Sequence, residues 1–214
     1  IAFLLCLSPL QVTANNAEWN TSGRVIAVSD IHGAFDEFVT LLTGARLIDD
    51  DGHWSGSSDH LVIVGDVLDR GAGSRDVLEM IMRLETEAKH AGGMVHLVLG
   101  NHEIMNVDGQ LNYVSYEGLK QFENEINPET SEKFKSGKEA RKYLFKRGNK
   151  YAKFMACTRQ TALIIGSNLF VHATIMPELA KKFKVNDLNI LVRKWLLGII
   201  NNDHKLAGIG NVGD

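Results

Sequence analysis

Three short apolar runs, each followed at once by polar residues, organise the first half of the chain. They cover residues 24–29, 60–64 and 94–99. Apolar runs of this length are typical of strands that are buried on both faces, as in a parallel sheet. The stretches 35–46 and 74–91 lie between them and predict helices, because their apolar residues recur at three- and four-residue spacing. The order strand, helix, strand predicts an α/β fold with parallel strands.

The second half of the chain has weaker signals. Residues 161–165 and 168–171 are apolar and flank a Gly-Ser pair, which predicts a β-hairpin. Apolar periodicity predicts helices over 113–125, 176–184 and 187–200. We interpret residues 107–153 as a helical cap over the site, and the lysine- and arginine-rich stretch 132–153 within it as a solvated helical face.

The first residues look like a targeting segment. Residues 1–14 resemble the hydrophobic part of a secretory signal peptide without its basic start, and small residues stand where signal peptidase cuts. The run is too short to span a bilayer, so no stable membrane insertion is expected after its removal. A buried N-terminal strand or helix stays open as the alternative. We expect residues 15–22 to be a linker, and the protein to reach the secretory pathway or a periplasm.

Composition excludes several classes of protein. The chain has 214 residues, is 44% hydrophobic and carries a formal net charge of −3. It can therefore bury the core of one domain, and it has neither the basic excess of a nucleic-acid-binding protein nor an acidic tail. Its two cysteines, Cys6 and Cys157, cannot form a disulfide framework, and removal of residues 1–14 would leave one thiol.

The polar residues that follow the first two strands have the chemistry of a metal and phosphate site. Asp30 and His32 end the first strand, and such a pair can chelate one cation. After the second strand, Asp66 can bridge two divalent cations, Asp69 can orient a neighbouring acid or base, and Arg70 can bind a phosphate through two hydrogen bonds. Buried charges need such partners. Taken singly, each motif is also compatible with a structural turn or a surface ion pair.

The third strand and the hairpin end in the same way. The third strand runs into Asn101-His102-Glu103, and the hairpin ends on His172. Open α/β sheets place their sites at the carboxyl ends of the strands, so these motifs are expected to meet at one edge. His60 and His96, in contrast, have no polar cluster around them, and we expect them to be satisfied in the core or, for His60, to lie at the surface.

These motifs resemble those of the PPP family of metal-dependent phosphoprotein phosphatases. The matching stretches are 30–33, 65–71, 100–103 and, less well, 171–173. Within that family, 66–71 together with 100–106 look most like the bacterial-type, Shewanella-like branch. The similarity covers roughly 24–172 and implies a calcineurin-like metallophosphatase fold of the α/β class, in which a β-sandwich flanked by helices carries a two-metal centre at one edge.

The resemblance also implies a role for each residue. Asp30 and His32 would bind the first metal, Asp66 would bridge both metals, and Asn101 and His172 would bind the second. His102 would be the general acid that protonates the leaving oxygen, held in orientation by Asp69. Arg70, with Asn101, would bind the phosphoryl oxygens. The cofactors would be two divalent ions, manganese, iron or zinc.

The implied reaction is metal-dependent hydrolysis of phosphomonoesters by a hydroxide that bridges the metals. The expected partner is a phosphorylated protein or peptide, on Ser/Thr or Tyr, and not a nucleic acid. A dinucleoside polyphosphate hydrolase stays open, because a related branch shares the Asp-x-His-Gly and Gly-Asn-His motifs, although Asp69-Arg70 and Glu103 favour the phosphoprotein phosphatases. A third alternative is a fragment that binds phosphorylated partners without turning them over.

Two departures from the family pattern affect these expectations. Ala173 and Thr174 follow His172 where the family has glycines. The family also has a further active-site arginine and a final histidine ligand, and nothing up to Asp214 matches either. We therefore expect 23–214 to be a metallophosphatase catalytic domain that is incomplete at its C-terminus, and the chain to be part of a longer open reading frame.

Overall fold

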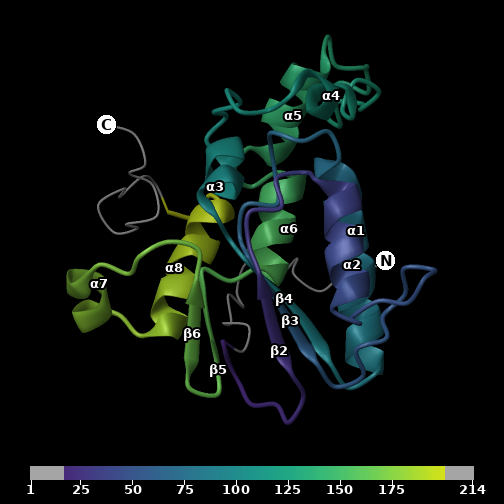
Figure 1. Ribbon diagram of the computed structural model, residues 1–214. Coiled ribbons are helices and arrows are strands. Elements are labelled where there is room, and N and C mark those ends of the chain that lie inside the picture. Colours follow the sequence, from purple (N-terminus) through teal and green to yellow (C-terminus); the bar gives the residue numbers. More distant parts are fainter. Residues whose placement is uncertain (1–16, 201–214) are drawn as a thin grey trace.

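Two three-stranded β-sheets packed face to face form the centre of the protein (Figure 1). The computed structural model describes residues 17–200. The predicted signal peptide, residues 1–14, lies outside the described residues, as does the stretch after 200. Among the described residues, none of the helices combines the length and the apolar character that crossing a membrane requires.

The first sheet is the predicted parallel one. Its strands are β2 (Val25–Val28), β3 (His60–Val64) and β4 (Met94–Val98), in the order β2-β3-β4. All three run parallel, so their carboxyl ends meet at one edge. Nearly every side chain of β3 is buried, as its continuous apolar run indicated.

The second sheet contains the predicted hairpin and one strand that the sequence did not predict. β5 (Ala162–Ile165) and β6 (Asn168–Val171) pair antiparallel. β1 (Glu18–Trp19) adds to β5 in parallel, in the order β1-β5-β6. The expected linker over 15–22 is therefore wrong at these two residues. The physical reason is Trp19, whose ring packs between the sheets and so ties this segment to the core.

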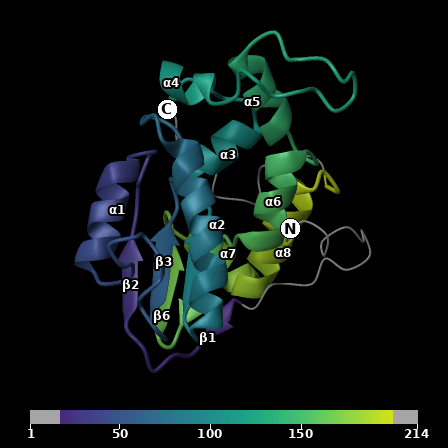
Figure 2. The same cartoon turned by 90° about the vertical axis from the view of Figure 1, so that its right-hand side faces the viewer.

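The space between the two sheets is filled by apolar side chains from both. Val62 and Val98 from the first sheet and Leu163 and Ile165 from the second are at most 2% exposed. This layer confirms the predicted β-sandwich. Outside it, α1 (Phe35–Gly44) and α2 (Ser74–His90) cover the outer face of the first sheet (Figures 1 and 2).

The remaining helices lie at the carboxyl edge of the first sheet and beside the second. They are α3 (Asn101–Val107), α4 (Tyr116–Lys120), α5 (Gly137–Phe145), α6 (Lys150–Thr158), α7 (Pro177–Lys182) and α8 (Val185–Leu196). The helix predicted over 113–125 is reduced to the five residues of α4. In Figure 1, α3, α4 and α5 lie above the sheets, and α8 lies beside β5 and β6. That residues 107–153 act as a lid over substrate stays a prediction.

One cysteine is paired in the chain as described. Cys157, in α6, is disulfide-bonded, and no cysteine among residues 17–200 is free. The single thiol expected after removal of residues 1–14 concerns the processed chain and stays a prediction.

Candidate active site

The loops that leave β2 and β3 have an unusual backbone. Five residues there have φ between 48° and 69°, in the left-handed region: Asp30, His32, Asp66, Asp69 and Arg70. L-residues with a side chain rarely adopt this region, and each such residue costs about 1–3 kcal/mol. All five were selected from the sequence as site residues. The strain concentrates where the predicted chemistry lies, and it persists only because other groups hold these loops in place.

Glu103 is the main anchor of the loop after β3. Its carboxylate is 1% exposed and accepts four backbone N–H bonds. The donors are Asp66, Val67, Leu68 and Gly100, at 2.8–3.2 Å. Burial raises the pKa of Glu103 and the charge of Asp66 raises it further, whereas the N–H donors lower it. The sequence places Glu103 in a family motif but does not indicate that it shapes the loop.

Two glycines allow the strand ends to come together. A Cβ at Gly65 would lie 2.6 Å from Nδ1 of His172, and one at Gly100 would lie 2.2 Å from Oδ1 of Asp66. Neither contact is sterically allowed, so any larger residue would push apart the ends of β3 and β4. Gly65 also has a φ of +81°, which favours glycine.

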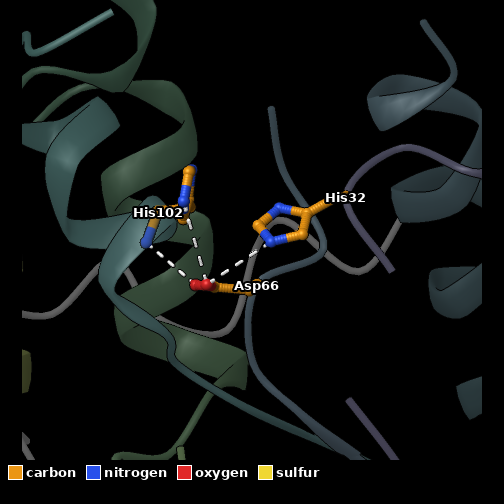
Figure 3. A group of neighbouring side chains, drawn as sticks. All are labelled: His32, Asp66 and His102. Atoms are coloured by element: carbon orange, nitrogen blue, oxygen red, sulfur yellow. Dashed lines mark hydrogen bonds and ion pairs between the residues drawn. The ribbon is translucent and has the colours of Figure 1, made fainter. Parts of the chain in front are cut away.

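Asp66 lies at the centre of the site (Figure 3). Its Oδ1 accepts the backbone N–H of His102 at 2.9 Å. Its Oδ2 faces Nε2 of His32 at 3.8 Å and Nε2 of His102 at 3.9 Å. The His32 ring donates from Nδ1 to the Leu68 carbonyl at 2.9 Å, so its Nε2 presents a lone pair. That buried nitrogen has no hydrogen-bond partner within residues 17–200.

His172 approaches Asp66 from the second sheet. Its Nδ1 donates to the Val64 carbonyl at 2.7 Å, and its Nε2 lies 3.0 Å from Oδ1 of Asn101 and 3.3 Å from Oδ2 of Asp66. Both neighbours of Nε2 are acceptors, so Nε2 carries a proton between them. The hydrogen bond to Asp66 raises the pKa of His172 to about 9. For Asp66, burial alone would raise the pKa, but the hydrogen bonds from His172 and His102 lower it.

These side chains form two groups that could each hold a cation. One is His32, Asp66 and His102, and the other is Asp30, Asp66 and His172; within each group the ligand atoms lie within 4.8 Å of one another. Asp66 belongs to both groups, which is the arrangement a bridging ligand requires. Asp30 and His32, expected on the same cation, fall into different groups, and the side chain of Asp30 is 58% exposed.

The donor set fits divalent cations. The unpartnered Nε2 of His32 is an orphaned buried acceptor, which a cation would satisfy. The proton on Nε2 of His172 lies between oxygens of Asn101 and Asp66, where a cation would bind. Imidazole nitrogens with carboxylate and amide oxygens suit zinc, manganese and iron alike.

His102 lies between Asp66 and a buried carboxylate. Its Nδ1 donates to Oδ2 of Asp69 at 2.8 Å, and its side chain is 3% exposed. This bond fixes the tautomer and leaves Nε2 directed towards Asp66. The ring of Tyr113 packs edge-on against His102 with a centroid distance of 5.2 Å.

Arg70 stands at the outer side of this group. Its backbone N–H donates to the Tyr113 carbonyl at 2.8 Å. Its side chain is exposed, which leaves the guanidinium accessible to a phosphoryl group. The segment that carries Tyr113 therefore borders the site, and the hydroxyl of Ser115 also donates to the Gly71 carbonyl at 3.4 Å.

Sequence reasoning missed the residues behind Asp69. Oδ1 of Asp69 accepts from Nη2 of Arg141 at 2.8 Å and from Nδ2 of Asn106 at 2.9 Å. Arg141, on α5, is 0% exposed, so the expected solvated face over 132–153 is wrong at this residue. Burial lowers the pKa of Arg141, and the charge of Asp69 opposes that shift.

Comparison with known proteins agrees with this geometry. A family model described as calcineurin-like phosphoesterase matches residues 23–203. A solved structure described as a cold-active protein tyrosine phosphatase superposes with a TM-score of 0.70 at 29% identity, covering 86% of this chain and 51% of that one.

The relatives of this chain among curated proteins include a protein phosphatase. An uncharacterised protein of Acanthamoeba polyphaga mimivirus is 41% identical over 134 residues, covering 58% of this chain and 50% of the relative. Shewanella-like protein phosphatase 2 of Arabidopsis thaliana is 29% identical over 204 residues, covering 82% of this chain and 52% of the relative. The chain spans about half the length of these curated relatives.

Proposed function

This chain belongs to the calcineurin-like phosphoesterase family, in the Shewanella-like branch of the phosphoprotein phosphatases, and we propose that it hydrolyses phosphomonoesters on a phosphorylated protein or peptide. One observation carries the proposal. Asp66 is shared by two groups of metal-ligating side chains, and the buried pair of His102 and Asp69 faces the same carboxylate. A phosphatase needs both parts, a centre for the phosphoryl group and a proton donor for the leaving oxygen.

We propose two divalent cations as cofactors, from among manganese, iron and zinc. His32 and Asp66 would serve one of them, and Asp30, Asp66, Asn101 and His172 the other. When bound, such a pair supplies Lewis-acid stabilisation to the phosphoryl oxygens and to the attacking water. The buried Nε2 of His32 and the acceptors around His172 support this assignment.

The chain's own residues carry the remaining steps. Arg70 binds the phosphoryl oxygens through its guanidinium and orients the ester. His102 gives the proton on Nε2 to the oxygen that leaves phosphorus, so that an alcohol departs rather than an alkoxide. Asp69 keeps the proton on Nδ1 and stabilises the imidazolium before transfer. His102 is then reprotonated from solvent, and the balance is ester and water to alcohol and inorganic phosphate.

A substrate comparison tests the proposal. The chain is loaded with manganese, its metal content is measured, and it is offered phosphoserine, phosphothreonine and phosphotyrosine peptides beside diadenosine tetraphosphate. Release of phosphate from the peptides, abolished in Asp66→Asn, is the expected result. Faster cleavage of diadenosine tetraphosphate would favour the dinucleoside polyphosphate hydrolase instead. Saturable binding of phosphopeptides without turnover, at two ions per chain, would favour the binding protein.

We also propose that the protein works outside the cytoplasm. The support is the signal-like composition of residues 1–14. N-terminal sequencing of protein secreted by a host that expresses the full reading frame tests it. A mature protein that begins after Ala14 is expected, and retention of residues 1–14 in the cytoplasm would contradict it.

A further inference from the structure

The carboxylate that orients His102 is unusually enclosed. Asp69 is 0% exposed. The orientation of its carboxylate decides whether Oδ2 can accept the hydrogen bond from Nδ1 of His102. A buried carboxylate without compensation is unstable by several kcal/mol. Here the compensation comes from a different part of the chain. The guanidinium of Arg141, also 0% exposed, forms an ion pair with Oδ1 at 2.8 Å.

Three side chains close a ring of hydrogen bonds behind Asp69. Arg141 donates from Nη2 to Asp69 and from Nε to Oδ1 of Asn106, the latter at 2.7 Å. Asn106 donates in turn to Oδ1 of Asp69 and to the carbonyl of His102, both at 2.9 Å. Oδ1 therefore has two donors, and within residues 17–200 Oδ2 accepts from His102. The ring fixes the plane of the carboxylate.

The position of Arg141 is itself fixed by packing. Its guanidinium carbon lies 5.3 Å from the ring centroids of both Phe122 and Phe145. The two ring centroids lie 6.1 Å apart. Contact with aromatic faces restricts the orientation of a guanidinium and favours its charge. Its Nη1 also donates to the Gly118 carbonyl at 3.4 Å, and Arg141 lines a cavity of about 190 Å³ between α2, α5 and α6.

From these contacts we infer that Arg141 is a positioning residue for the reaction, which acts through Asp69 to set the ring of His102. The inference rests on the proposed function, since it assigns Arg141 to the proton-donating part of that site. It gives the α5 segment a part in the chemistry that is separate from any role as a lid. The contacts of Arg141 within residues 17–200 go to Asp69, Asn106 and the groups around them and not to the metal-ligating side chains, so its removal is expected to leave metal content unchanged.

Leaving-group dependence tests this inference. Proton donation matters most when the leaving oxygen is basic, so phenyl phosphate and p-nitrophenyl phosphate form a matched pair of substrates. Arg141→Met should lower kcat for phenyl phosphate by about 100-fold and for p-nitrophenyl phosphate by about tenfold or less, with KM unchanged for both. Arg141→Lys, which keeps the charge but not the planar fork, should fall between wild type and Arg141→Met. Equal losses on both substrates would overturn the inference.

Arg159→Met is the matched control. Arg159 is another buried arginine, 3% exposed and ion-paired with Glu85, but it does not contact Asp69 or His102 within the described chain. Loss of Arg159 should lower the midpoint of thermal unfolding, as loss of Arg141 should, but it should leave the ratio of the two kcat values as in wild type. A changed ratio in Arg159→Met would show that lost stability alone explains the effect, and the inference would fail.

A second readout does not depend on turnover. In the zinc-loaded protein with nitrogen-15 in its imidazoles, the Nδ1–H signal of His102 is identified by its absence in His102→Gln. We expect this signal in wild type and in Arg159→Met, and its loss or large shift in Arg141→Met. An unchanged signal in Arg141→Met would overturn the inference. If wild type hydrolyses no phosphomonoester, the proposed function fails, and this signal still decides whether Arg141 positions His102. If Arg141→Met does not fold, Arg141→Lys is compared in its place.

Discussion

The protein holds buried histidines in two contrasting places. At the carboxyl edge of the β2-β3-β4 sheet, His102 donates to one carboxylate and faces another. Between the sheets, His60 and His96 hydrogen-bond to each other at 3.1 Å and pack against Trp19. Burial lowers the pKa of His96 to about 3, whereas the bond to Asp66 raises that of His172 to about 9. Burial alone keeps a histidine neutral, and a neighbouring carboxylate is what prepares it to hold a proton or a cation.

The backbone differs in the same way. The edge is built from left-handed residues held by Glu103, and the interior from regular ladders between neighbouring strands. The left-handed backbone at the edge therefore lowers stability, a cost that the regular ladders of the interior do not have. Four substitutions break or sharpen this contrast.

The largest effect is expected from Asp66→Asn. The substitution keeps the shape of the side chain and an acceptor for the N–H of His102, but it removes the charge shared by both ligand groups. We expect affinity for both cations to fall together by at least about 100-fold, and hydrolysis to be lost. Calorimetric titration of manganese and elemental analysis measure this. Two ions retained per chain would show that Asp66 is not the shared ligand.

His102→Ala comes next. It removes the proposed acid while the loop anchor Glu103 stays. We expect kcat for a phosphopeptide to fall by about 10²–10⁴-fold, with a smaller loss for p-nitrophenyl phosphate. Steady-state kinetics on the two substrates check it. Losses of the same size on both substrates would show that His102 is not the general acid. His102 would then be assigned as a metal ligand together with His32 and Asp66.

Glu103→Gln weakens the hydrogen bonds that hold the strained loop after β3. The amide cannot accept four N–H bonds and brings donors towards the N–H groups of Asp66 and Gly100. We expect the free energy of unfolding to fall by about 2–4 kcal/mol. Urea denaturation measures it, with Glu87→Gln as control, because Glu87 accepts the Trp54 N–H near the surface. Similar losses in the two variants would mean that Glu103 does not hold the loop.

The smallest effect at neutral pH is expected from His96→Leu, in the interior. The folded pKa of His96, about 3, lies below the usual histidine pKa of 6.5, so the unfolded chain binds the extra proton between these values. Stability from the neutral ring is fully present above pH 6.5 and is lost as the pH falls towards 3. Wild type should lose up to about 1.4 kcal/mol per pH unit more than His96→Leu in this window. Urea midpoints from pH 4 to 7 check it, and parallel curves would contradict it.

The sequence predicted the parallel strands and the motifs at their ends because each apolar run stops abruptly at polar residues. It did not predict β1, since two residues form too short a pattern, and only the packing of Trp19 fixes them. The separation of Asp30 from His32 into different groups depends on left-handed turns that spacing does not encode.

Arg141 was hidden in a stretch rich in lysine and arginine, although a signal was present. The buried residues of α5 are Gly137, Ala140, Arg141, Leu144 and Phe145. They follow the three- and four-residue spacing of a core-facing helix, with the arginine inside the stripe. A charge on an apolar stripe indicates a buried partner. The partner is Asp69, which lies 72 residues away in the sequence and could not be predicted from the local pattern.

That separation bears on how the molecule is made. The bond between Arg141 and Asp69 joins residues 72 apart, and the bond between His172 and Val64 joins residues 108 apart. Contacts that close such long loops form late in folding, after local helices and strand pairs. A chain leaving the ribosome therefore has most of its secondary structure before its chemistry is assembled. If the β5–β6 hairpin docks slowly, activity is expected to recover with a lag during refolding. The circular dichroism signal of secondary structure should already be nearly native during that lag.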